Sequence, residues 1–200
     1  MERIVFASNN EGKLEEIRLL ARDLCFEVIG MKEAGILIDI PENGNTFLEN
    51  SMIKAKTIHK LIGGTVMADD SGLCIDALGG MPGIMSARFF GTNTTYKEKF
   101  SEINRLLTGV PLDKRTANFI CAITVICEDS SEITAQESMN GIILAHEVGE
   151  NGFGYDPIFF LPEFNKTVAQ LSDEEKNVVS HRGKAFRSIL AKLSGSCYSI

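Results

Sequence analysis

The sequence lacks any long apolar run. No stretch approaches the roughly 20 consecutive apolar residues that a membrane-spanning helix needs. The opening segment, MERIVFA, is too short and too acidic for a secretory signal peptide. We therefore expect a cytoplasmic protein without a membrane partner.

Paired cysteines and metal-ligand spacings are also missing. The cysteines, Cys25, Cys74, Cys121, Cys127 and Cys197, are odd in number and never spaced C-x-x-C. This pattern supports neither a disulfide framework nor a cysteine zinc site. Most of them have apolar neighbours, which is typical of small buried side chains in a reducing compartment. No H-E-x-x-H motif or closely spaced histidine pair indicates zinc.

Basic residues are fewer than acidic residues. The chain has 20 Lys and Arg against 27 Asp and Glu, a formal net charge of -7. DNA affinity comes largely from cations that displace counterions from phosphates, so nucleic acid is disfavoured as the main partner. A local basic pocket for a small ligand remains open. Internal repeats and low-complexity tracts are absent, and 200 residues fit one domain over 1–200.

Strand and helix patterns both occur along the chain. Apolar runs predict strands over 3–7, 65–68, 118–128, 131–144 and 158–161. Helical spacing, capping boxes and glycine stops predict helices over 12–24, 46–62, 95–107 and 183–193, with a helical turn after 172. Long adjacent strands in the second half favour an α/β fold with a mixed twisted sheet flanked by helices.

The first polar cluster lies after a strand and before a helix, where backbone N–H groups and the helix dipole favour phosphate. It comprises Ser8, Asn9, Asn10, Glu11, Gly12 and Lys13. The spacing fails the P-loop motif twice, because Ala7 stands at its first glycine and Leu14 at its Ser/Thr. A helix cap with a solvated lysine remains an equal alternative.

The second cluster is a carboxylate pair, Asp69 and Asp70, followed by Ser71. Adjacent residues at a strand end point to opposite faces, so one carboxylate can face a site. Carboxylate oxygens suit Mg²⁺, and a carboxylate beside metal can deprotonate water. A turn with Asp caps is the alternative. The absence of G-x-S-x-G gives a serine hydrolase no support.

Two further clusters lie near the carboxyl end. Phe153, Gly154, Tyr155 and Asp156 place glycine beside aromatic rings, on which a flat base can stack. A glycine-rich turn with core aromatics is the alternative. Lys176 with the segment 180–184, SHRGK, is the densest group of donors, or else an exposed helix start. Together the four clusters describe a nucleotide pocket.

The sequence resembles the RdgB-like inosine triphosphate pyrophosphatases, which hydrolyse non-standard purine nucleoside triphosphates. The resemblance rests on SNNEGKLEE, PENGNTFLENSMIKA, ADDSGLCIDALGGMPGIMSARF, GFGYDPIFF and LSDEEKNVVSHRGKA, in the family's order. It implies hydrolysis of ITP, dITP and XTP to the monophosphate and diphosphate with Mg²⁺, which cleanses the nucleotide pool. It also implies an elongated two-lobed body with a central cleft, and a homodimer.

The resemblance also implies the roles of individual residues. Asp70 would be the catalytic carboxylate, and Glu42 with Asp70 would bind the metal. Ser8, Asn10 and Lys13 would hold the phosphates, with the rest of the segment 8–13 also binding substrate, and Ser71 would contact substrate. The base and sugar would be surrounded by Phe153, Gly154, Tyr155, Asp156, Lys176, His181 and Arg182. Met85 and Phe90 depart from the family's usual residues, which affects the expected shape of the cleft or interface.

Two other functions remain open at this point. A pyrophosphatase of modified pyrimidine nucleotides would use the same phosphate and metal groups, although SHRGKA favours purine. A non-catalytic nucleotide-binding regulator would need the same pocket, although the intact pair at 69–70 favours an enzyme. Diphosphate release with Mg²⁺ and a purine-versus-pyrimidine substrate panel separate these alternatives.

Overall fold

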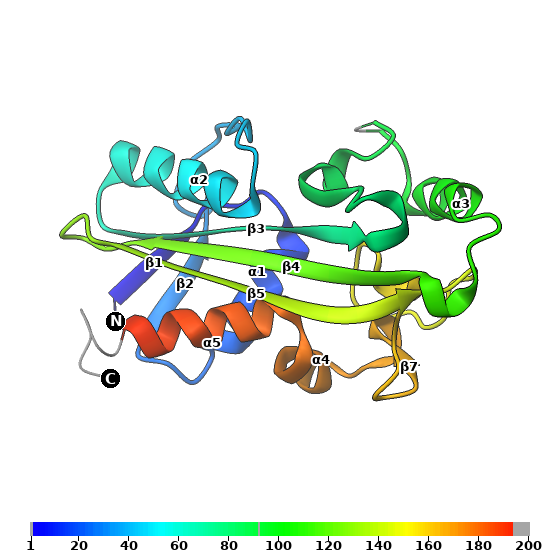
Figure 1. The fold of residues 1–200 in the computed structure, drawn as a ribbon. Helices are drawn as coiled ribbons and strands as arrows, with labels where there is room; N and C mark the ends of the chain where they lie inside the picture. The colour runs from blue at the N-terminus through cyan, green and yellow to red at the C-terminus, as the bar shows by residue number, and fades with distance from the viewer. Residues whose placement is uncertain (1, 92, 194–200) are drawn as a thin grey trace. The chain divides into compact units, whose positions relative to one another are not determined.

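The protein forms one mixed sheet with helices packed against it (Figure 1). It is described here by a computed structural model, over residues 2–91 and 93–193. The strand order is β2-β1-β3-β4-β5-β6-β7. Strand β1 runs parallel to β2 and β3, whereas β6 runs antiparallel to β5 and β7. The predicted α/β class with a mixed sheet is therefore confirmed.

The elements have the following bounds. The strands are β1 (Glu2–Phe6), β2 (Phe26–Gly30), β3 (Thr65–Ile75), β4 (Thr116–Ile126), β5 (Glu132–Ile143), β6 (Phe159–Leu161) and β7 (Lys166–Thr167). The helices are α1 (Glu11–Ala21), α2 (Phe47–Ile62), α3 (Tyr96–Leu106), α4 (Asp173–Val179) and α5 (His181–Leu193). Strands β2 and β7 were not predicted from the apolar pattern.

Three helices begin where the capping pattern predicts. The side chains of Thr46, Thr95 and Ser172 each accept a hydrogen bond from the backbone N–H three residues later. Helix α2 ends at Gly63, whose φ of 67° suits a residue without Cβ and whose N–H donates to the His59 carbonyl. Local hydrogen-bonding chemistry therefore sets these helix ends.

Two predicted boundaries are wrong in ways that affect the site. The strand expected to end at 68 continues as β3 to Ile75, so Asp69 and Asp70 lie inside a strand and not in a turn. The helix expected from 183 begins at His181, so His181 and Arg182 are helical and buried. Apolar periodicity missed both because polar residues occupy buried positions there.

The chain divides into two compact units. Unit 1 comprises the chain up to Asp70, Cys121–Glu137 and the chain from His181 onward, and unit 2 comprises Ser71–Ile120 and Ser138–Ser180. Strands β3, β4 and β5 contribute residues to both. Whether 1–200 behaves as one domain stays a prediction.

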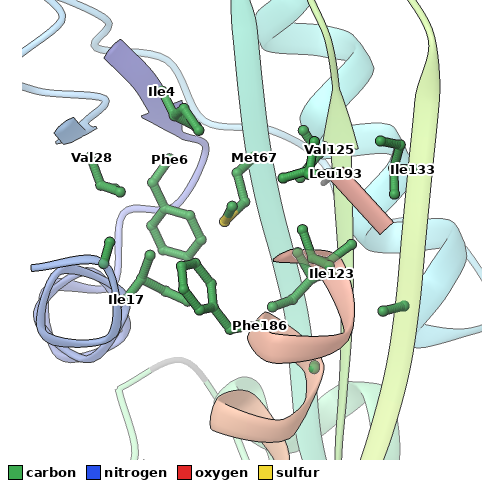
Figure 2. Close-up of a cluster of buried hydrophobic side chains, with 14 of the residues drawn as sticks. Ile4, Phe6, Ile17, Val28, Met67, Ile123, Val125, Ile133, Phe186 and Leu193 are labelled. Atoms are coloured by element: carbon green, nitrogen blue, oxygen red, sulfur yellow. The ribbon is translucent and has the colours of Figure 1, made fainter. Parts of the chain in front are cut away.

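Unit 1 has a separate core on each face of its sheet. Ile4, Phe6 and Met67 pack with α1 and α5, and Figure 2 shows these side chains gathered with Ile17 and Phe186. The alternate residues of the same strands, among them Val5 and Val66, pack with α2 on the other face. Because side chains alternate along a strand, Asp69 belongs to the α1/α5 face and Asp70 to the α2 face.

Unit 2 has its own core, built from the continuation of β3 with α3 and β6. Its members include Leu73, Ile75, Phe100, Tyr155 and Phe159. Ser86 ties this core together, because its Oγ accepts from the Leu73 N–H and its carbonyl accepts from the Tyr155 hydroxyl. The loop that carries Tyr155 is therefore anchored from inside the unit.

The expectations about cysteines and membranes are only partly tested. Cys121 and Cys127 are buried, Cys74 is half-buried, and Cys25 is exposed, contrary to the expectation of burial; all four are free thiols. Cys197 lies outside the described residues. None of the helices described is both long and apolar enough to cross a membrane.

Candidate active site

Asp69 is a fully buried carboxylate with fixed cationic partners. Lys13 Nζ lies 3.1 Å from its Oδ1 and 3.0 Å from its Oδ2, and Arg182 Nε donates to Oδ2 at 3.3 Å. The Cys121 thiol donates to the same oxygen at 3.9 Å. Arg182 also pairs with Glu16 of α1. This network ties β3 to α1 and α5 on one face of the sheet.

Asp70 faces different partners on the other side of β3. Asn50 Nδ2 of α2 donates to its Oδ2 at 3.0 Å, and Lys54 Nζ lies 3.9 Å from its Oδ1. The same Lys54 Nζ donates to Glu42 Oε1 at 2.6 Å. The oxygens of Glu42 and Asp70 thus converge on one ammonium group.

The two adjacent carboxylates have opposite pKa shifts. Burial alone would raise the pKa of Asp69, but the charges of Lys13, Arg182 and Lys54 outweigh it and hold that pKa well below its ordinary value. Burial raises the pKa of Asp70, and the charges of Lys54 and Lys13 only partly offset that rise. A pair whose environments separate the two pKa values is typical of groups with different roles. Asp69 is a locked anion, and Asp70 accepts a proton more readily.

Lys54 is a buried lysine that keeps its positive charge. Burial alone would lower the pKa of this lysine, yet the charges of Asp69, Asp70 and Glu42 raise it above its ordinary value. Lys54 therefore carries its charge inside the protein, 6% exposed. This is the kind of fixed cation that stabilises phosphate oxygens.

The segment 8–13 forms the turn from β1 into α1. Asn10 is the N-cap, and its Oδ1 accepts from the Lys13 N–H at 3.1 Å, while Ser8 Oγ accepts from the Asn10 N–H at 3.2 Å. Asn9 and Asn10 are exposed and Gly12 is half-buried. Glu11 pairs with Lys32 on the surface. The helix cap is therefore present, and Lys13 points its ammonium to Asp69 rather than to solvent.

In unit 2 the predicted loop residues and Lys176 come together. Asp156 Oδ2 accepts from Lys176 Nζ at 2.7 Å and from the Phe153 N–H at 2.9 Å. Lys176 Nζ also lies 4.8 Å from the centre of the Phe153 ring, in cation–π range. A Cβ on Gly152, which has φ +74°, would come within 2.2 Å of Asp156 Oδ2. The close packing of this ion pair therefore requires glycine at 152.

The remaining predicted residues have different surroundings. His181 and Arg182 are the first residues of α5, 5% and 2% exposed, and belong to unit 1. Ser71 follows Asp70 in β3 and is half-buried. The structure thus groups Lys13 and Arg182 around Asp69, Glu42 near Asp70, and Phe153 to Asp156 with Lys176.

Sequence reasoning missed three polar groups of this site. Asn50 and Lys54 lie on the buried face of α2, and Glu16 lies on α1 beside Arg182. The available signal was position: Asn50 and Lys54 are four residues apart, on one helix face with buried Ala55 and Ile58 as neighbours. A lysine at a core-facing position needs a buried carboxylate partner.

The donor set suits a hard cation. Glu42 and Asp70 supply carboxylate oxygens around a point that a positive charge already occupies. Within the described part of the chain, no group of three or more His, Cys, Asp or Glu side chains forms a complete protein site. Mg²⁺ is usually held by one or two carboxylates together with substrate phosphates, so two carboxylates fit it.

Comparison with known proteins covers nearly the whole chain. The model of the Ham1 family matches residues 4–192. A curated dITP/XTP pyrophosphatase of Caldanaerobacter subterraneus subsp. tengcongensis is 48% identical over 186 residues, which is 92% of each chain.

Solved structures agree with this match. The Ham1 protein of Staphylococcus aureus is 40% identical with a TM-score of 0.86, over 97% of this chain and 99% of that one. A HAM1 protein of Coxiella burnetii is 39% identical with a TM-score of 0.87, over 98% of this chain and 100% of that one. The fold and the sequence therefore point to the same relatives.

Proposed function

The chain belongs to the Ham1 family, and we propose that it hydrolyses the non-standard purine nucleoside triphosphates ITP, dITP and XTP to the nucleoside monophosphate and diphosphate. One observation carries the proposal: a buried carboxylate, Asp70, shares the Lys54 ammonium with Glu42. Similarity to a curated dITP/XTP pyrophosphatase over 92% of the chain supports the same reaction.

Glu42 and Asp70 are the proposed ligands of Mg²⁺. The ion, when bound, neutralises charge on the triphosphate, which lowers the barrier to attack at phosphorus. Lys54 supplies a further positive charge beside these two carboxylates, and Asn50 orients Asp70 through its 3.0 Å hydrogen bond. A chain with a net charge of -7 thus binds a polyanion through a few local cations.

Asp70 is also the proposed general base. We propose that water attacks the α-phosphorus in line with the bond to the diphosphate leaving group. Asp70 would take the proton of that water, because its carboxylate is held in place by the hydrogen bond from Asn50. Asp69 has the opposite role, because it holds Lys13 and Arg182 in place.

The triphosphate is proposed to bind at the amino end of α1. Backbone N–H groups there and the hydroxyl and amide side chains of the segment 8–13 supply donors. Lys13 supplies the charge, with its ammonium held at 3.0 Å from Asp69. Ser71, next to Asp70, is the proposed further substrate contact.

The nucleoside is proposed to contact the loop Phe153 to Asp156, with Lys176, His181 and Arg182. Hypoxanthine and xanthine carry a carbonyl at C6 where adenine has an amino group, so protein donors pair with the first two and face another donor in adenine. Unpaired buried polar groups can give discrimination of roughly 10⁴ or more. Guanine shares the C6 carbonyl, so its rejection depends on its 2-amino group. We expect efficient turnover of ITP and XTP and slow turnover of ATP and GTP.

A homodimer in the cytoplasm that cleanses the nucleotide pool completes the proposal. The dimer and the role in the nucleotide pool are what the family resemblance implies, and the cytoplasmic location is the expectation from the sequence. Size-exclusion chromatography with light scattering tests the dimer, since a monomer at all concentrations would contradict it.

The substrate panel tests the activity. Purified protein is incubated with ITP, dITP, XTP, ATP, GTP and pyrimidine triphosphates, with Mg²⁺ and with a chelator, and diphosphate is measured. High kcat/KM for ITP and XTP only with the metal supports the proposal. Comparable kcat/KM for all nucleotides contradicts the selectivity, a pyrimidine preference favours the related pyrophosphatase, and binding without diphosphate release favours a regulator.

A further inference from the structure

Tyr96, the first residue of α3, is an exposed aromatic with an unusually fixed ring. It is 38% exposed. Its ring meets the Tyr155 ring edge-on, with centroids 5.3 Å apart at 90°, and lies 6.1 Å from the Phe100 ring. The Lys99 ammonium covers one face at 4.9 Å from the centroid. A tyrosine ring with a buried apolar side and an accessible hydroxyl suits a position where one end contacts protein and the other contacts a polar ligand.

Lys99, which contacts one face of the Tyr96 ring, is itself held in place. Only 2% of the residue is exposed, and its Nζ donates to the Ala87 carbonyl. Because a buried ammonium needs favourable contacts, the lysine and the Tyr96 ring stabilise each other. The ring is therefore positioned before any ligand arrives.

The polar edge of Tyr96 faces the loop proposed to bind the nucleoside. A Cβ built on Gly154 would meet Tyr96 first, with Oη at 3.7 Å, Cζ at 3.8 Å and Cε1 at 3.9 Å. Gly154 has φ +68° and presents bare backbone at this point. The phenol thus lies beside the peptide that follows Phe153.

The Tyr96 hydroxyl can still donate a hydrogen bond to a ligand. Across residues 2–91 and 93–193, none forms a hydrogen bond with it. Burial, and then the charge of Asp156, raise the pKa of Tyr96, so the hydroxyl keeps its proton and can donate. The nearby Asp156 is neutralised by its ion pair with Lys176, so the hydroxyl can donate to an uncharged polar atom of the nucleoside.

We propose that Tyr96 is a nucleotide-binding residue whose hydroxyl donates a hydrogen bond to the nucleoside part of the substrate beside Gly154. This inference rests on the proposed function and adds a residue to it. The acceptor is a polar atom of the base or of the sugar. If the acceptor is the 2′-hydroxyl of the sugar, dITP lacks the contact. If the acceptor is on the base or elsewhere on the sugar, ITP and dITP both make it.

Tyr96→Phe tests the proposal because it removes only the hydroxyl and keeps the fixed ring. One neutral hydrogen bond corresponds to a rise in KM of about two- to tenfold, with kcat unchanged, because the contact is made equally in ground and transition states. An effect with ITP but not with dITP assigns the acceptor to the 2′-hydroxyl, whereas equal effects assign it to the base or the rest of the sugar. Either result supports the proposal.

Phe164→Tyr is the matched control. Phe164 is an exposed ring of the same unit, 42% exposed, so this variant changes one hydroxyl at a comparable surface position. We expect its KM to equal that of the wild type. A KM for Tyr96→Phe that also equals the wild-type value for every nucleotide overturns the proposal.

A binding measurement separates the failure of this inference from the failure of the proposed function. Titration calorimetry with ITP in the presence of Ca²⁺ gives Kd for wild type and Tyr96→Phe. A wild type without turnover contradicts the proposed function, but a weaker Kd for the variant would still support the Tyr96 contact. Equal Kd values, or no binding by either protein, overturn it.

Discussion

Asp69 and Asp70 are neighbours in one strand, yet their surroundings differ in nearly every respect. Asp69 is closed in by Lys13, Arg182 and the Cys121 thiol on the α1/α5 face. Asp70 faces α2, where one amide donates to it and one ammonium lies 3.9 Å away. Strand alternation alone produces the separation, because consecutive side chains project to opposite faces.

The comparison shows how one dipeptide can supply two functions. A carboxylate with two close cationic partners stays ionised and fixes the groups around it. A carboxylate whose burial outweighs its attractive partners keeps the capacity to accept a proton. The role of each aspartate is therefore set by the groups around its carboxylate, since the two carboxylates are chemically identical.

Removing the charge at Asp70 should give the largest effect on activity. Asp70→Asn keeps the size of the side chain and loses the base and a metal ligand, so kcat for ITP should fall by about 10²–10⁴-fold. The melting temperature and ITP binding should change little. Asp23→Asn, at an exposed side chain, is the control and should retain wild-type kcat. Turnover near the wild-type rate in Asp70→Asn would remove the assigned role.

Removing the charge at Asp69 should instead destabilise the fold. Asp69→Asn leaves Lys13 without its buried counter-charge and Arg182 with Glu16 alone, and breaking a buried pair costs about 3–5 kcal/mol. Urea unfolding of this variant and of Asp23→Asn gives the difference in the free energy of unfolding. A loss below about 1 kcal/mol, as for an exposed pair, would mean that the network holds nothing in place.

Glu42 should affect the metal more than the fold. Glu42→Gln weakens one carboxylate ligand, and the Mg²⁺ concentration for half-maximal activity should rise by at least about tenfold, the lower end for groups that orient metal ligands. Glu163→Gln, at an exposed position, serves as the control. An unchanged Mg²⁺ requirement in Glu42→Gln would place the ion elsewhere.

The smallest effect concerns the thiol on the Asp69 face. Burial, followed by the charge of Asp69, raises the pKa of Cys121 to about 12, so little thiolate exists at neutral pH. Cys25 is exposed. In the folded protein a thiol reagent should label Cys25 within minutes and leave Cys121 unlabelled, as read by peptide mass mapping. Equal labelling of both would show that the α1/α5 face opens readily.

Much of the architecture could be predicted from local signals. Caps at Thr46, Thr95 and Ser172 set helix starts because their hydrogen bonds involve only neighbouring residues. The end of β3 was missed, since its buried aspartates resemble a polar loop until their partners are known. Those partners are distant in sequence: Lys54 is 16 residues and Asn50 is 20 residues from Asp70, and Arg182 is 113 residues from Asp69.

The residues of the candidate site also divide into those that the sequence indicates and those that only the folded structure brings together. Motif resemblance pointed to Asp70, Glu42 and Lys13, whose residue types suit metal and phosphate. Lys54 was marked only by its core-facing position in α2, and nothing local marked Tyr96, because a tyrosine after a helix cap is ordinary. Only the folded chain shows that Lys54 lies between two carboxylates and that Tyr96 lies against Gly154.

The route of the attacking water tests the account most directly. Wild-type protein is incubated with ITP and Mg²⁺ in ¹⁸O-enriched water, and the products are separated and weighed by mass spectrometry. Attack at the α-phosphorus, with Asp70 as base, predicts one ¹⁸O atom in inosine monophosphate and none in diphosphate. Label in the diphosphate, or release of inosine diphosphate with labelled phosphate, would contradict it.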